Sequence, residues 1–131
     1  MSEQSQRALV VDDEEIIRYV LSEDLEEIGY ECVQASSGQS ALEKLASQKF
    51  QVVMLDIRMP GVNGLEVLKT IRASYPDTCV IMISALANPD VADRAVRSMG
   101  ADAFVSKPWH NEELQTIVGR AVQQRAAAGE P

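Results

Sequence analysis

The stretch Gln51-Val52-Val53-Met54-Leu55-Asp56 decides the fold class of this chain. It is a short apolar run that ends in an acid, and a run without polar alternation is typical of a strand covered on both faces. Further short runs rich in apolar or β-branched residues occupy residues 8–11, 31–35, 79–83 and 103–105. We therefore expect five strands, of which the third is buried on both sides.

Amphipathic segments separate these runs and predict helices. In residues 14–28, Ile17, Leu21, Leu25 and Ile28 recur at helical spacing, and Gly29 is suited to end that helix. The later helices are expected to begin at Ser37-Gly38, at a capping box of Asn63 and Glu66, at Asn88-Pro89, and at His110 or Asn111. Five strands alternating with five helices predict a doubly wound α/β fold with a parallel sheet.

Length and composition limit the chain to one acidic globular domain. It has 131 residues, a formal net charge of −8 and 46% hydrophobic residues. The negative charge argues against direct binding of nucleic acid, and no apolar stretch approaches the about 20 residues of a membrane helix. We expect a cytoplasmic protein with a disordered segment at residues 1–6, a domain at residues 7–124, and a flexible tail or linker at residues 125–131. Cys32 and Cys79 are expected to be buried free thiols.

Chemistry-bearing residues follow four of the predicted strands. The first strand ends at Asp12-Asp13, the third at Asp56, the fourth at Ser84 and the fifth at Lys107. Ligands of open α/β sheets bind at the carboxyl ends of the strands, so we expect these side chains to meet there. Three crowded carboxylates repel one another, and either one takes up a proton or a cation binds. An all-oxygen site of this kind suits Mg²⁺.

The same residues suit phosphoryl transfer to a carboxylate. A carboxylate can act as a nucleophile and form an aspartyl phosphate, which needs a metal and cations on the phosphoryl oxygens. Asp56 fits the nucleophile, Lys107 the cation and the Ser84 hydroxyl a hydrogen-bond donor, while Asp12 and Asp13 fit the metal.

The motifs resemble those of the receiver domain of two-component response regulators. The matching stretches extend over most of the chain, from about Arg7 to Val122. They are Val11-Asp12-Asp13-Glu14, Asp56-Ile57-Arg58-Met59-Pro60-Gly61 with Asn63-Gly64, Ile83-Ser84-Ala85, Gly100-Ala101 and Lys107-Pro108. The resemblance implies a flavodoxin-like sheet of strand order 2-1-3-4-5.

The resemblance also implies roles for individual residues. Asp56 would receive a phosphoryl group from a phosphohistidine. Mg²⁺ would be bound by Asp13, Asp56 and the backbone carbonyl of Arg58, with Asp12 acting largely through water. The Lys107–Pro108 bond would be cis. Ser84 and Phe104 match the family's switch pair, which reshapes the face formed by the fourth helix, fifth strand and fifth helix.

The expected partners are a sensor histidine kinase or phosphotransfer protein and a downstream output domain or protein. A homodimer linked to phosphorylation is a further expectation, and the chain would act on no separate substrate. One alternative is a phosphatase of the haloacid dehalogenase kind, but that class needs an acid where Arg58 stands. Another is a pseudo-receiver without phosphotransfer. The acids of the first helix, Glu14, Glu15, Glu23, Asp24, Glu26 and Glu27, form either a solvated face or a docking surface for a basic patch.

Overall fold

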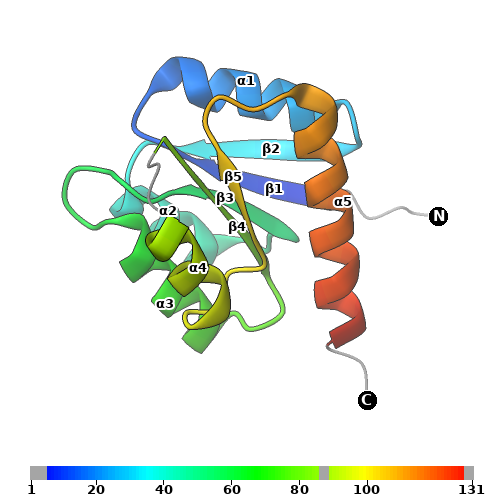
Figure 1. Ribbon diagram of the computed structural model, residues 1–131. Coiled ribbons are helices and arrows are strands. Elements are labelled where there is room, and N and C mark those ends of the chain that lie inside the picture. Colours follow the sequence, from blue (N-terminus) through cyan, green and yellow to red (C-terminus); the bar gives the residue numbers. More distant parts are fainter. Residues whose placement is uncertain (1–5, 86–88, 129–131) are drawn as a thin grey trace.

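A computed structural model describes residues 6–85 and 89–128, in which strands and helices alternate along the chain (Figure 1). The strands are β1 (Gln6–Val11), β2 (Tyr30–Ala35), β3 (Val52–Asp56), β4 (Cys79–Ser84) and β5 (Ala103–Ser106). The helices are α1 (Glu15–Glu26), α2 (Gly38–Ser47), α3 (Gly64–Ser74), α4 (Pro89–Arg97) and α5 (Asn111–Ala128). The predicted alternation is confirmed.

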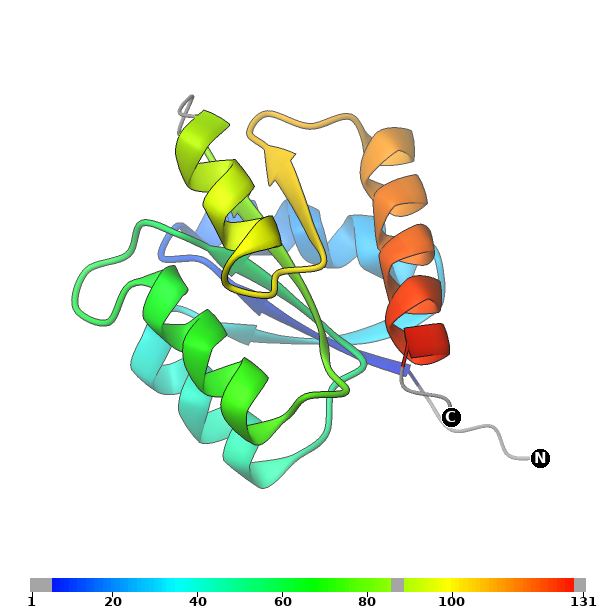
Figure 2. The same cartoon turned by 60° about the horizontal axis from the view of Figure 1, so that its bottom comes forward.

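The five strands form one parallel sheet of order β2-β1-β3-β4-β5, as the resemblance implied. Helices α1 and α5 cover one face, and α2, α3 and α4 cover the other (Figures 1 and 2). This is the doubly wound arrangement. The strand order reverses between β1 and β3, so the crevice that such folds use for ligands lies at the carboxyl ends of these two strands.

The core has two halves, one on each side of the sheet. Side chains alternate along β1, so Leu9 and Val11 pack toward α2 and α3 while Ala8 and Val10 pack toward α1 and α5. Every residue of β3 and β4 is buried, which confirms a third strand covered on both faces. The strand begins at Val52 and not at the predicted Gln51, which is polar and exposed. The two halves therefore hold the central strands rigidly in place.

Local sequence signals form the predicted caps. The side chain of Asn63 accepts a hydrogen bond from the Glu66 amide at 3.1 Å, and the Asn63 amide donates to the Glu66 carboxylate at 3.3 Å. This is the expected capping box of α3. After α1, Gly29 has a φ of 101°, a conformation that glycine adopts without strain. The expected cap at Asn88 lies outside the described residues.

The first helix and the first strand differ from the predicted boundaries. Helix α1 ends at Glu26, and Ile28 lies in the turn that follows, 37% exposed instead of facing inward. Strand β1 begins at Gln6, which pairs with Tyr30 of β2, so the predicted disorder of residue 6 is wrong. Strand pairing, which the local sequence does not reveal, orders this residue. Residues 1–5 lie outside the described part of the chain.

The predicted tail is wrong for residues 125–128, which continue α5. Alanine is the strongest helix former, so the run after Arg125 favours the helix instead of ending it. The Arg125 guanidinium donates to the Asp102 carboxylate at 2.7 and 2.9 Å and to the Pro76 carbonyl at 3.4 Å. These contacts fasten the last turns of α5 to the body of the domain. Residues 129–131 lie outside the described part.

The cysteines are free, as expected, although Cys32 is only half-buried while Cys79 is buried. Burial raises the pKa of the Cys79 thiol to about 12 and that of the Cys32 thiol to about 11, so both are poor nucleophiles. Among residues 6–85 and 89–128, no helix is long and apolar enough to cross a membrane.

Gly64 allows α3 to begin directly against the end of β3. A Cβ atom at this position would clash with the carbonyl oxygen of Asp56 and lie 2.8 Å from the Cα of Ile57. Both are backbone atoms that cannot move aside cheaply. We expect Gly64→Ala to lower the free energy of unfolding by about 1–3 kcal/mol, measured by urea denaturation.

Gly119 provides the matched control, because a Cβ there meets nothing within 4 Å and the residue is inside α5. Gly119→Ala should raise the free energy of unfolding by about 1 kcal/mol, since alanine favours the helix. Equal stability of the two variants would contradict the role given to Gly64.

Candidate functional site

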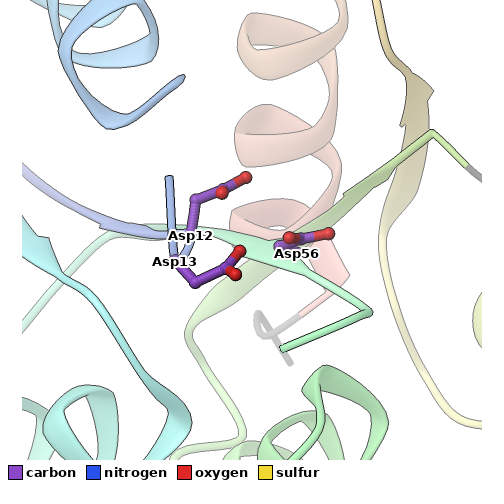
Figure 3. Close-up of side chains that lie close together, drawn as sticks. All are labelled: Asp12, Asp13 and Asp56. Carbon is purple, nitrogen blue, oxygen red and sulfur yellow. The ribbon is translucent and has the colours of Figure 1, made fainter. Parts of the chain in front are cut away.

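Three carboxylates meet at the carboxyl edge of the sheet, and we call Asp12, Asp13 and Asp56 the acidic cluster. Each residue has a carboxylate oxygen within 4.8 Å of the corresponding oxygens of the other two. Figure 3 shows the three side chains close together at the ends of β1 and β3. The convergence predicted from the strand ends is thus present in the structure.

Strand register explains why these residues meet. Val11 of β1 pairs with Leu55 of β3, so the next residue on each strand, Asp12 and Asp56, extends past the same edge. Asp56 in turn pairs with Ile83 of β4, and Ser84 follows directly. Because all strands are parallel, every polar residue that ends a run is brought to the same edge.

Asp12 is fully buried, and each of its backbone and side-chain polar groups forms a hydrogen bond. Its backbone N–H donates to the Ala35 carbonyl of β2 at 3.2 Å, and its own carbonyl accepts from Arg18 at 2.9 Å. One carboxylate oxygen accepts from the Glu14 amide at 2.9 Å, and the other accepts from Lys107 at 2.7 Å. A buried carboxylate of this kind is tolerated only because it is paired and hydrogen-bonded.

Lys107 joins the acidic cluster from the loop after β5. Its Nζ lies 2.7 Å from Asp12 and 3.6 Å from Asp56, and its backbone N–H donates to the Ser84 carbonyl at 2.9 Å. Burial alone lowers the pKa of Lys107, but the hydrogen bond to Asp12 and the charges of Asp56 and Asp12 outweigh it, so the pKa is raised. The side chain is therefore a fixed cation. The Lys107–Pro108 bond is cis, in agreement with the expectation.

Asp56 has an unfavourable position for a charged carboxylate. Burial and the neighbouring charge of Asp12 raise its pKa from the ordinary 3.8 to about 6, although Lys107 and the backbone N–H of Arg58 act in the opposite direction. Lys107 thus offsets only part of the unfavourable effect of burial and of the neighbouring carboxylates on ionised Asp56. The raised pKa indicates that an additional positive group would stabilise the ionised form of the Asp56 carboxylate.

The acidic cluster opens to solvent at Asp13, which is exposed while Asp12 and Asp56 are buried. The cluster supplies oxygen donors only, and its carboxylates and Lys107 carry a formal charge of −2. A hard divalent cation such as Mg²⁺ matches both the donor type and the charge, and the open side leaves room for its water ligands. These observations fit a cation site at this edge.

The remaining predicted site residues lie around the cluster. Ser84 is buried at the end of β4. Phe104 of β5 is half-buried and packs against the core on the α2, α3 and α4 side of the sheet. Arg58 has an exposed side chain, while its backbone N–H reaches the Asp56 carboxylate.

Two contacts of α1 were not expected from the sequence. Asp24, grouped with the acids of an exposed face, is instead buried and accepts hydrogen bonds from the Trp109 indole at 2.8 Å and the Asn111 amide at 2.9 Å. Arg18 reaches the Asp12 backbone. The sequence did not predict these contacts, because each joins α1 to a different segment of the chain. Only the contact of Arg18 could have been anticipated locally, since helical side chains point toward the helix N-terminus and this directs Arg18 to the turn that carries Asp12.

Comparison with known proteins identifies the family. Residues 8–119 match the model of the response regulator receiver domain. Regulatory protein AtoC of Escherichia coli (strain K12) is 40% identical over 117 residues, 89% of this chain and 25% of that protein. The probable transcriptional regulator ycf27 of Guillardia theta is 42% identical over 124 residues, 94% of this chain and 47% of that protein. A crystal structure of a CheY-like receiver domain protein from Methanospirillum hungatei JF-1 has a TM-score of 0.88 at 26% identity, covering 96% of this chain and 100% of that one.

The chain spans between about a quarter and about half of the length of these curated relatives. The family match includes the acidic cluster, Ser84 and Lys107. The resemblance drawn from the motifs and the fold it implied are both confirmed. The chain therefore belongs to the response regulator receiver domain family, the signalling module of two-component systems.

Proposed function

We propose that this receiver domain takes a phosphoryl group onto Asp56 from a phosphohistidine of a sensor histidine kinase or phosphotransfer protein. The observation that carries the proposal is the buried Asp56 carboxylate, crowded by Asp12 and Asp13 and reached by the Lys107 ammonium at 3.6 Å. This arrangement combines a nucleophile with a fixed cation, the two groups that phosphoryl transfer to a carboxylate requires of the protein.

Asp56 provides the nucleophilic oxygen. This oxygen forms a bond to phosphorus while the bond from phosphorus to the histidine nitrogen breaks, and that nitrogen keeps the electron pair. Lys107, now 2.7 Å from Asp12, is the group that neutralises charge on the phosphoryl oxygens. Ser84 is close by, since it follows the residue paired with Asp56, and its hydroxyl can donate to a phosphoryl oxygen.

Mg²⁺ is the cofactor that we propose for this site. Asp13, Asp56 and the Arg58 backbone carbonyl would hold it, with Asp12 acting through water. The fit rests on the oxygen donors within 4.8 Å and on the uncompensated charge of the cluster. When bound, Mg²⁺ supplies positive charge to the cluster and to the oxygens of the transferred group.

We further propose that the domain acts as a switch and turns over no separate substrate. A phosphate ester hydrolase with an aspartate nucleophile needs an acid two positions later, and this chain has Arg58 there. Ser84 would move toward the phosphoryl group, and the half-buried Phe104 ring would turn inward behind it. The altered face of α4, β5 and α5 would then contact an output domain, a partner protein or a second copy.

Substitution of the phosphoacceptor tests the assignment directly. We expect Asp56→Asn to abolish labelling by acetyl phosphate and Mg²⁺, because the amide is not a nucleophile for phosphorus. Intact-protein mass spectrometry detects the added phosphoryl group.

Asp77→Asn is the matched control, since Asp77 is exposed in the loop before β4, at the opposite edge of the sheet. This variant should be labelled like the wild type. Undiminished labelling of Asp56→Asn would refute the assignment of the phosphoacceptor.

The raised pKa of Asp56 predicts a stability effect with a defined sign. Because the folded-state pKa is about 6 and the ordinary value is 3.8, ionised Asp56 destabilises the folded protein above pH 6, and the penalty disappears below pH 3.8. In EDTA at neutral pH, Asp56→Asn should raise the free energy of unfolding by about 1–3 kcal/mol.

Urea denaturation at several pH values measures this difference, which should shrink as the pH falls from about 7 to about 4. Added Mg²⁺ should stabilise the wild type more than the variant, because the cation offsets a charge that the variant lacks. Equal stability of the two proteins at neutral pH in EDTA would contradict the unfavourable position of Asp56.

A further inference from the structure

We propose that Arg18 is a positioning residue for the cation site, because its guanidinium fixes the peptide that joins Asp12 to Asp13. The inference rests on the proposed binding of Mg²⁺ by the acidic cluster. It adds a residue of α1 that touches neither the cation nor the phosphoryl group and acts only through the Asp12 backbone.

The contacts of Arg18 join three elements. Arg18 lies in the first turn of α1, where its side chain points back toward the helix N-terminus. Nη1 donates to the Asp12 carbonyl at 2.9 Å, and Nε donates to the Gln34 side chain of β2 at 3.1 Å. The guanidinium is planar, and its two hydrogen bonds, one part-buried and one exposed, hold it in one orientation.

The Asp12 carbonyl is important because it shares a planar peptide unit with the Asp13 N–H. The orientation of this carbonyl therefore sets the direction in which the chain continues to the Asp13 Cα. The carboxylate of Asp12 is held separately by Glu14 and Lys107. Arg18 thus acts mainly on Asp13, whose exposed carboxylate depends on its backbone for its direction into the cluster.

The charge of Arg18 and its hydrogen bond to Asp12 have opposite effects on the affinity of the site for Mg²⁺. A guanidinium beside the Asp12 backbone repels a divalent cation, so removal of the charge alone would tighten Mg²⁺ binding. Loss of the positioning contact would weaken binding, as loss of outer contacts does at other metal sites. A purely structural role would change stability and leave the affinity for Mg²⁺ unaltered. The three roles of Arg18 therefore predict different changes in the affinity for Mg²⁺ when the residue is replaced: an increase, a decrease or no change.

The test is a titration with MgCl₂ at constant ionic strength, followed by the amide NMR shifts of Asp12, Asp13 and Lys107. We expect Arg18→Met to raise the dissociation constant for Mg²⁺ about tenfold. Arg18→Lys should also raise the dissociation constant, because lysine keeps the repelling charge but cannot form two bonds in one plane. Since the charge is unchanged in this variant, its weaker binding reports the loss of the positioning contact alone. In EDTA, the Asp13 amide shift should already differ in both variants, since it reports the shared peptide.

Arg7→Met is the matched control, as it removes the same charge from β1 at the far end of the strand, where Arg7 pairs with Glu31 at 3.4 Å. Its dissociation constant should stay within about twofold of the wild type, because salt screens a distant charge. Thermal unfolding in EDTA shows that each variant is folded, and Arg18→Lys decides the question if Arg18→Met does not fold.

The outcomes separate this inference from the proposed function. If the wild type binds Mg²⁺ and the Arg18 variants bind it equally well or more tightly, the positioning role is wrong while the proposed cation site stands. If the wild type shows no response to Mg²⁺, the cation site is wrong and the role of Arg18 is wrong with it.

Discussion

Electrostatic repulsion between Asp12 and Asp56 is the constraint on which the rest of the structure depends. Both carboxylates are buried at the edge of the sheet, and a single lysine, at 2.7 Å from one and 3.6 Å from the other, lies between them. Lys107 donates a hydrogen bond to the Asp12 carboxylate. It offsets only part of the effect of burial and of Asp12 on Asp56, whose pKa is raised to about 6. The folded domain therefore retains negative charge that can be lowered by a proton or a divalent cation.

The sheet tolerates this arrangement because its interior is rigid. Strands β3 and β4 are buried along their whole length between two layers of helices, so the strand ends cannot move apart to relieve the repulsion. Gly64 lets α3 begin against the backbone of Asp56, and Arg18 connects the Asp12 backbone to α1 and β2. Burial of apolar side chains far from the site thus holds the charged groups together.

Much of this arrangement was predictable, because a parallel sheet brings the ends of its strands to one edge. The change from apolar to polar residues at Asp56 and Ser84 marks both a strand end and a site residue, so one local pattern predicted the fold and the cluster together. The contacts of Arg125 with Asp102 and of Trp109 with Asp24 were not predictable in this way. They join residues far apart in sequence, and the local pattern cannot distinguish a paired side chain from a solvated one.

The ¹³C NMR titration of the Asp56 side-chain carboxyl tests the central claim most directly. In EDTA, the crowding of the cluster predicts a pKa of about 6 for this group. In saturating Mg²⁺, the pKa should fall by at least about one unit, because a bound cation stabilises the ionised form. A value close to the ordinary 3.8 in EDTA, unchanged by Mg²⁺, would contradict the account.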